Sequence, residues 1–122
     1  MDPRTLARLH GAGRLAVGLF YVAAPGQAAR AWIGADGDRA TVGVLARAFG
    51  ARDGAIGLGV LRAIDAGHGA RPWVRAGVAA DAADLVATLR ARDSLPALQV
   101  FGVALIAGGS VAVGLWLDRA VD

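Results

Sequence analysis

The chemistry that this chain could perform depends on six charged residues that interrupt otherwise apolar stretches. They are Arg14, Arg47, Arg52, Asp53, Asp81 and Asp84. On a helix, no opposite charge lies three or four positions from Arg47, Arg52 or Asp53, so no local ion pair neutralises them. An unpaired charge costs about 2.5–3.5 kcal/mol at the centre of a membrane helix. Because three of the six are positive and three are negative, we predict that they pair between helices in a buried polar network.

Such a network has two compatible interpretations. It could be a set of structural salt bridges that fixes the register of the helices. It could also line a polar pocket or a proton or ion path, which is the usual role of ionisable groups inside membranes. In that case Asp53, Asp81 or Asp84 handles a proton while an arginine binds a substrate oxygen. We expect a small, partly open cavity among the first three long helices, with the last helix as an apolar wall.

Other candidate sites are weaker. His10 and His68 are far apart, and the chain has no Cys and no Glu to complete a metal-binding set, so we expect no metal and no bound cofactor. The Asp81-x-x-Asp84 spacing places two carboxylates on one helix face, where they could hold Mg²⁺. Neighbouring arginines compete for the same carboxylates.

The composition favours lipid as the surrounding solvent. Hydrophobic residues make up 56% of the chain and the mean hydropathy is +0.49, whereas the apolar share of soluble domains is roughly 45–50%. All thirteen basic residues are Arg and all ten acidic residues are Asp, a bias typical of a GC-rich genome. The arginines are scattered, without a basic stripe interleaved with aromatic residues, so we expect no nucleic-acid partner.

The first helix is expected to begin almost at the N-terminus, because Asp2-Pro3 combines an N-cap residue with proline at the first helical position. Residues 15–29 carry no charge and contain Pro25 near their end. A rival interpretation is a secretory signal peptide with residues 15–24 as its apolar core. We favour the helix, because no small-x-small cleavage site precedes a polar mature start.

Residues 27–40 are expected to form a short interfacial helix and loop, with Trp32 at the level of the lipid headgroups. The second long helix is expected over about residues 39–64. Small residues four apart on this helix let another helix approach closely. They are Ala46, Gly50 and Gly54.

Two more long helices complete the chain. One is expected over residues 72–89, after a glycine-rich loop that ends at Pro72. Ser94 is the expected N-cap of the last helix. Residues 94–117 contain twenty-four positions without a charge, more than the roughly 20 residues that span a bilayer. This is the clearest transmembrane segment of the chain.

These elements predict an all-α fold in which residues 1–122 form a single domain. The predicted architecture is a four-transmembrane-helix bundle with a short interfacial helix and loop between the first two long helices. The alternative is a soluble four-helix bundle. A helix that is apolar on all sides must be buried on every side in a soluble protein, and three short neighbours can scarcely surround the last helix.

The distribution of arginine predicts a multi-pass protein of the bacterial inner (plasma) membrane with both termini in the cytoplasm. If the helices alternate in direction, the side that holds both termini and residues 62–75 carries seven arginines, and the other side carries four. The side with more arginine is expected to be inside. The lipid bilayer is then the first partner of this chain.

Four short sequence features are shared with a group of known proteins. They are Arg14-x3-Gly18, Pro25, Arg47-x2-Gly50-x-Arg52-Asp53 and Asp81-x2-Asp84. Over roughly residues 12–118, the chain resembles small four-helix bacterial membrane proteins of uncharacterised families that are broadly DoxX-like. The resemblance implies an architecture more than an activity, although a few members of such families are linked to quinone or sulfur redox chemistry. The absence of cysteine does not suit a thiol-based role.

The leading functional expectation is an accessory or interaction protein that packs against a second copy of itself or against a larger membrane complex. Two stripes of small residues would mediate this packing, Ala46/Gly50/Gly54 and Ala104/Gly108/Ala112. The alternative is a small membrane enzyme or redox accessory protein that acts on a lipid-soluble substrate such as a quinone. A transporter or channel component is a third interpretation, which requires several chains because one chain has too few helices.

Overall fold

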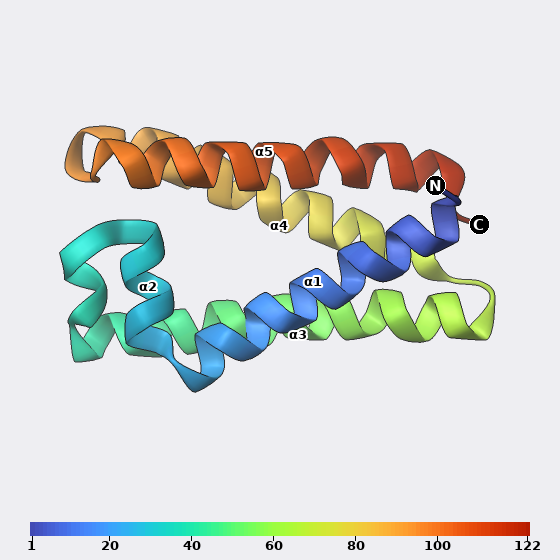
Figure 1. Ribbon diagram of the computed structural model, residues 1–122, viewed down its shortest axis with the longest axis horizontal. Coiled ribbons are helices and arrows are strands. Elements are labelled where there is room, and N and C mark those ends of the chain that lie inside the picture. Colours follow the sequence, from blue (N-terminus) through green and yellow to red (C-terminus); the bar gives the residue numbers. More distant parts are fainter.

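The computed structural model describes all 122 residues and consists of helices joined by short turns. The five α-helices are α1 (Pro3–Ala23), α2 (Pro25–Ile33), α3 (Ala40–Ala66), α4 (Ala70–Arg90) and α5 (Ala97–Ala120). Two short 3-10 helices, Gly34–Asp38 and Arg92–Ser94, precede α3 and α5. There is no strand, so the predicted all-α class is confirmed (Figure 1).

The first and last helices begin in different ways. At the start of α1, the Asp2 side chain accepts a hydrogen bond of 2.9 Å from the backbone N–H of Thr5, as the N-cap prediction requires. The start of α5 differs from the prediction, because Ser94 lies in the preceding 3-10 helix and Pro96 is the residue before the first helical one. The proline keeps Leu95 extended (φ −114°, ψ 151°), so the helix cannot begin at Ser94.

The predicted short helix between the first two long helices is α2. Pro25 stands at its first position, where proline is favoured because its missing N–H would have no partner within the helix. The helix therefore begins two residues before the predicted segment 27–40. It turns away from α1 and lies across one end of the bundle, in contact with α3 and α5 (Figure 1).

Glycines allow α1 and α3 to pack closely where they cross. A Cβ added to Gly18 would lie 2.5 Å from the backbone oxygen of Gly50, and one added to Gly50 would lie 2.5 Å from the backbone oxygen of Gly18. Only a residue without a side chain fits at either position. The predicted stripe of Ala46, Gly50 and Gly54 thus meets a helix of the same chain at its two glycines. This contact corrects the expectation that the stripe binds a partner.

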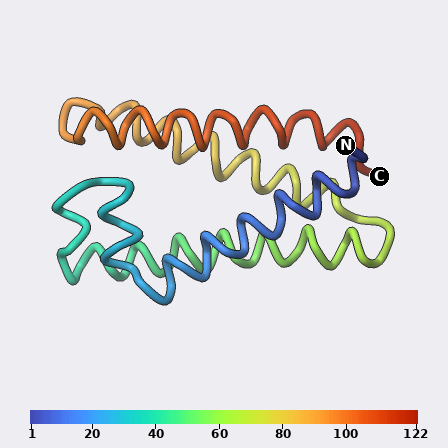
Figure 2. Tube along the Cα trace, in the orientation of Figure 1, coloured from blue at the N-terminus to red at the C-terminus, as the bar shows by residue number.

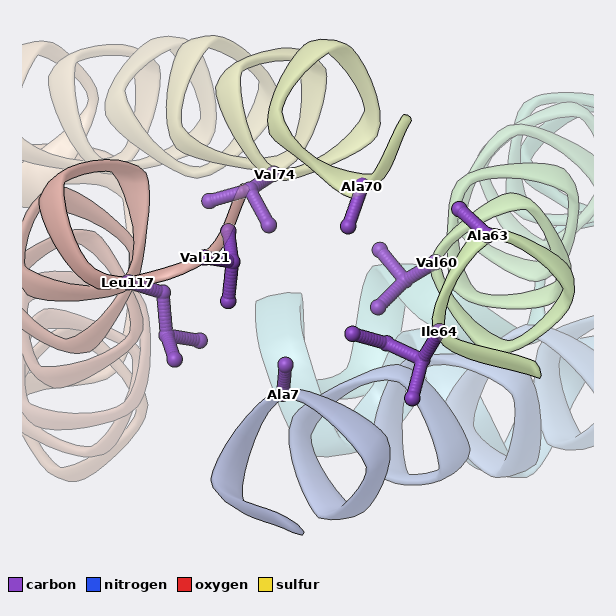
Figure 3. Packing of buried hydrophobic residues seen from close by; sticks show 8 residues of the cluster. All are labelled: Ala7, Val60, Ala63, Ile64, Ala70, Val74, Leu117 and Val121. Carbon is purple, nitrogen blue, oxygen red and sulfur yellow. The ribbon is translucent and has the colours of Figure 1, made fainter. Parts of the chain in front are cut away.

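The four long helices form two pairs that meet at one end of the molecule. α1 packs along α3, and α4 packs along α5. Both chain termini lie at the end where the pairs converge (Figure 1, Figure 2). Small and medium-sized apolar side chains fill this end and point toward one another (Figure 3). They are Ala7, Val60, Ala63, Ile64, Ala70, Val74, Leu117 and Val121.

By length and composition, α5 is the one helix that could cross a membrane. In its most apolar stretch 17% of the residues are buried, whereas an all-apolar helix in the core of a soluble protein is buried on every side. Its residues Leu98, Phe101, Leu105 and Ile106 are each more than half exposed. The structure therefore provides a helical bundle with one candidate span, where the sequence predicted four.

Candidate functional site

The central contact of the site is an ion pair between Arg14 on α1 and Asp81 on α4. Nη1 of Arg14 donates to Oδ2 of Asp81 at 3.1 Å, and Nη2 donates to Oδ1. Both residues are buried, with 6% and 8% of their surface exposed. Gly77, one turn before Asp81, makes room for the guanidinium, since a Cβ there would lie 3.0 Å from Nη1 of Arg14. The sequence of α4 thus provides both the partner and the space for Arg14.

Asp53 on α3 lies beside this pair but is held less completely. Its Oδ1 is 3.2 Å from Nη2 of Arg14 and 3.7 Å from Nη2 of Arg52. Neither contact has hydrogen-bond geometry, so Oδ1 is a buried oxygen without a hydrogen-bond partner. Buried carboxylate oxygens nearly always accept hydrogen bonds. Asp53 is therefore a carboxylate with charged neighbours but with unused hydrogen-bonding capacity.

A second ion pair joins Arg52 on α3 to Asp84 on α4. Nη2 of Arg52 lies 2.6 Å from Oδ2 of Asp84, and Nη1 donates to Oδ1 at 3.2 Å. The guanidinium carbon of Arg52 also lies 4.6 Å from the ring centre of Phe49, a cation–π distance. The Arg52 side chain remains 38% exposed. This pair closes one edge of the polar network.

Five of the six predicted residues come together, and Arg47 does not. Arg47 is exposed on α3 and takes part in no ion pair, which corrects its assignment to the network. It precedes Asp53 by six positions, and at 100° per residue it points to a different side of α3. Without Arg47, the network contains two guanidinium groups and three carboxylates, where the sequence suggested equal numbers.

A chain of hydrogen bonds extends the network to α5. The hydroxyl of Ser110 donates to Oδ2 of Asp81 at 2.6 Å, and Nε2 of His10 lies 2.8 Å from the same hydroxyl oxygen. Because the hydroxyl proton is directed at the carboxylate, Nε2 of His10 is the donor in the second bond. A serine nucleophile needs a base to take its proton, and Asp81 is already paired with Arg14. The arrangement therefore orients His10 and does not form a nucleophilic triad.

Aromatic side chains line the same cavity as Asp53 and Asp84. Phe49 has its ring centre 4.5 Å from that of Tyr21 and 4.8 Å from that of Trp32. Nε1 of Trp32 donates to Thr88 at 3.0 Å, and the Thr88 hydroxyl donates to the backbone oxygen of Asp84. Trp32 was expected as an anchor at the lipid headgroups. It packs inward instead, because α2 turns its indole against α3 and α4.

These groups surround a cavity of about 630 Å³, well above the roughly 300 Å³ at which ligand pockets begin. Its polar lining comprises His10, Arg14, Tyr21, Trp32, Asp53, Asp81, Asp84 and Ser110. The remaining lining is apolar and includes Val17, Ala28, Phe49, Val103 and Ala107. All five helices contribute, so the cavity is larger than expected and Ser110 interrupts the predicted apolar wall of α5.

The lining residues that are most exposed are all non-polar. They are Leu9, Gly13, Val17, Phe20, Ala31 and Ile106. The charged residues Arg14, Asp53 and Asp81 lie at the buried side. A molecule in the cavity would therefore have charges on one side and an apolar opening on the other.

The carboxylates considered for a metal ion are each paired with an arginine. No group of three or more His, Cys, Asp or Glu side chains could hold a metal ion. The Asp81-Asp84 pair considered for Mg²⁺ is divided, since Asp81 faces Arg14 and Asp84 faces Arg52. The terminal nitrogens of both arginines are used by these carboxylates. The Nε of each arginine is buried without a hydrogen-bond partner, so the expectation that an arginine binds a substrate oxygen stays a prediction.

Several lining residues were not among the predicted ones, notably His10, Tyr21, Phe49 and Ser110. For His10 the sequence does contain a signal. His10 lies four positions before Arg14 and therefore on the same helix face. Neither a protein-family model, nor a curated protein, nor a solved structure matches this chain.

Proposed function

We propose that this chain is a small integral membrane protein that binds a lipid-soluble small molecule in the cavity. The observation that carries the proposal is the cavity of about 630 Å³, which joins a buried ion network to a non-polar opening. Binding sites for small molecules are concave, mostly apolar and equipped with a few converging polar groups. The polar groups here come from α1, α3, α4 and α5, so they converge only when the bundle is assembled.

Two features support a membrane location. α5 exposes large apolar side chains along its length, and water is a poor solvent for such a surface. Of the six charges expected at membrane depth, the five in the network lie against opposite charges, whereas Arg47 of α3 is unpaired. We propose that α1, α3 and α4 cross the bilayer with α5, in the bacterial inner membrane, with both termini in the cytoplasm.

The likeness to DoxX-like membrane proteins remains part of this proposal. It rests on the motifs of α1, α3 and α4 that build the network. A quinone is one neutral member of the ligand class, since its ring suits the aromatic lining and its oxygens could meet Tyr21 or His10. The paired arginines and the absence of a nucleophilic triad give no support to a chemical reaction after binding.

A matched pair of glycine variants tests the proposal with decylubiquinone as the probe. Gly13 lines the cavity and Gly109 does not, and a Cβ at either position would meet nothing within 4 Å. Gly13→Leu places a side chain at a position that lines the cavity, whereas Gly109→Leu adds the same side chain outside it. Binding is measured in a non-ionic detergent by quenching of tryptophan fluorescence, because Trp32 lies in the cavity wall.

We expect wild type and Gly109→Leu to bind the probe alike, and Gly13→Leu to bind at least about tenfold more weakly, a change of 1.4 kcal/mol. Circular dichroism and thermal unfolding show whether both variants fold. Equal quenching in wild type and in Gly13→Leu would mean that the probe partitions elsewhere, and would overturn the proposal.

Self-association is a second candidate function, supported by the outer face of α5. The stripe Ala104/Gly108/Ala112 is not covered within the chain, since a Cβ at Gly108 would meet nothing within 4 Å. If two copies pack through this stripe, Gly108→Leu should convert a dimer to a monomer in detergent. Light scattering after gel filtration measures the mass, and a wild-type monomer would exclude this candidate.

A further inference from the structure

The balance of charge beside the cavity indicates which kind of ligand the cavity accepts. Two guanidinium groups face three carboxylates, and all five lie within one connected network. The terminal nitrogens of Arg14 donate to Asp81 and those of Arg52 to Asp84, while the Nε of each arginine is buried without a hydrogen-bond partner. Asp53 shares these two arginines without a partner of its own. When all five groups are ionised, the network beside the cavity carries one negative charge in excess.

The position of Asp53 makes this excess available to a ligand. The residue is 5% exposed, its Oδ1 accepts no hydrogen bond, and it lines the cavity. A buried charge of this kind is stabilised by a counter-charge at close range. His10 faces Ser110 and makes no ion pair with Asp53, so the protein provides no third cation at this point.

The aromatic side chains nearby suit the same kind of ligand. Tyr21, Trp32 and Phe49 lie within 6.4 Å of one another by ring centres and belong to the same cavity wall. Aromatic rings attract cations, most strongly where water is excluded. Phe49 already does so, because its ring contacts the guanidinium of Arg52.

We infer that the cavity selects a lipophilic monocation, an apolar or aromatic body with one positive charge that lies against Asp53 and the aromatic rings. This inference rests on the proposed function, since it assigns a charge to the ligand of the same cavity. It also predicts that a neutral quinone binds more weakly than a cation of similar size.

Two ligands of the same shape isolate the effect of charge. The benzyltrimethylammonium ion and neopentylbenzene differ only in having nitrogen or carbon at the quaternary centre. Binding of each to the full chain is measured by equilibrium dialysis in a non-ionic detergent, with protein-free detergent as the reference for partition. For wild type we expect the cation to bind at least about tenfold more tightly than the neutral isostere.

Two variants change the charge balance in opposite directions. Asp53→Asn keeps the shape of the side chain and removes the excess charge, so the preference for the cation should disappear. Arg52→Gln removes a positive charge from the more exposed pair, so the preference should increase at least about threefold. Binding of neopentylbenzene should stay unchanged in both, which also shows that each variant retains the cavity.

The outcomes separate the inference from the proposed function. If wild type binds both ligands equally, or if Asp53→Asn keeps the preference, the monocation assignment is wrong while the cavity remains a binding site. If wild type binds neither ligand nor decylubiquinone, the proposed function itself is wrong. If Asp53→Asn does not fold, the direction of the change in Arg52→Gln decides, and an unchanged or weaker preference overturns the inference.

Discussion

Arg14 and Asp81 pair at the centre of the bundle although sixty-seven residues separate them in the sequence. The pair links α1 to α4, which otherwise belong to different helix pairs. It therefore fixes how the two pairs sit relative to each other, and with that the width of the cavity between α1 and α5.

Removing one member of this pair should be strongly destabilising. Arg14→Ala leaves the carboxylates of Asp53 and Asp81 buried without their guanidinium, and Asp81→Ala leaves Arg14 without its main partner. Each should lower the free energy of unfolding by about 3–5 kcal/mol. Denaturant-induced unfolding in detergent, followed by circular dichroism, measures the change.

A double variant and a surface control complete this test. The Arg14→Ala/Asp81→Ala double variant should lose less than the sum of the two single changes, because neither Arg14 nor Asp81 is then buried without the other, although Asp53 still lacks Arg14. Arg47→Ala should change stability by no more than about 0.5 kcal/mol, since Arg47 is exposed and unpaired. Additive losses, or a large effect at Arg47, would contradict the network described here.

The crossing of α1 and α3 should not tolerate a side chain. A Cβ at Gly18 would lie 2.5 Å from a backbone oxygen of α3, so Gly18→Ala forces the helices apart and should cost about 1–3 kcal/mol. Gly109→Ala on the open face of α5 is the matched control, and alanine should make that helix slightly more stable. Thermal unfolding of the two variants side by side measures the difference. Equal melting temperatures would show that α1 and α3 do not cross at Gly18.

The N-cap of α1 predicts a pH dependence. Hydrogen bonding from the Thr5 backbone N–H holds the pKa of the Asp2 carboxyl, which lies before the first helix, below its ordinary value. The cap therefore stabilises the fold above the unfolded-state pKa of about 3.9. This stabilisation is lost as pH falls through the lower folded-state value.

Asp2→Ala should accordingly melt below wild type near neutral pH, and the gap should close in acid. Asp2→Asn caps the helix without titrating, so the difference in melting temperature between Asp2→Asn and Asp2→Ala should remain at all pH values. Melting temperatures measured across an acid series test both statements. A gap between wild type and Asp2→Ala that grows in acid would rule out the capping role of the carboxylate.

Reporter fusions test the proposed topology. Both termini lie at one end of the bundle (Figure 1), and Gly37 lies at the opposite end, in the segment between α2 and α3. A reporter inserted at Gly37 should be periplasmic, and one fused after Asp122 should be cytoplasmic. Activity of both reporters on the same side of the membrane would be incompatible with four crossings.

Charge spacing revealed part of the site in advance. Arg52 and Asp53 have no opposite charge three or four positions away on their own helix, and the structure places Arg14 on α1 beside Asp53 and Asp84 on α4 beside Arg52. The assignment of Arg47 failed because periodicity shows which residues share a face, but not which of them another helix covers. Arg47 shares its face of α3 with Gly50 and Gly54, which meet α1, yet it is itself exposed, so a position on a covered face did not bury it.

The cavity was harder to predict, because it depends on how far α1 and α5 separate. His10 and Ser110 are one hundred residues apart and meet only in the folded chain. The inward position of Trp32 depends on the turn of α2 at Pro25, which places the indole beside Thr88. Local sequence patterns predict helices well, but they do not determine the distances between helices.

Native mass spectrometry of the protein released from its own membranes shows whether the cavity holds a ligand. We expect one small molecule bound per wild-type chain, retained by Gly109→Leu and absent from Gly13→Leu, because only the latter places a side chain at a position that lines the cavity. A wild-type chain without any bound molecule, or the same adduct on Gly13→Leu, would contradict the claim that the cavity is a ligand site.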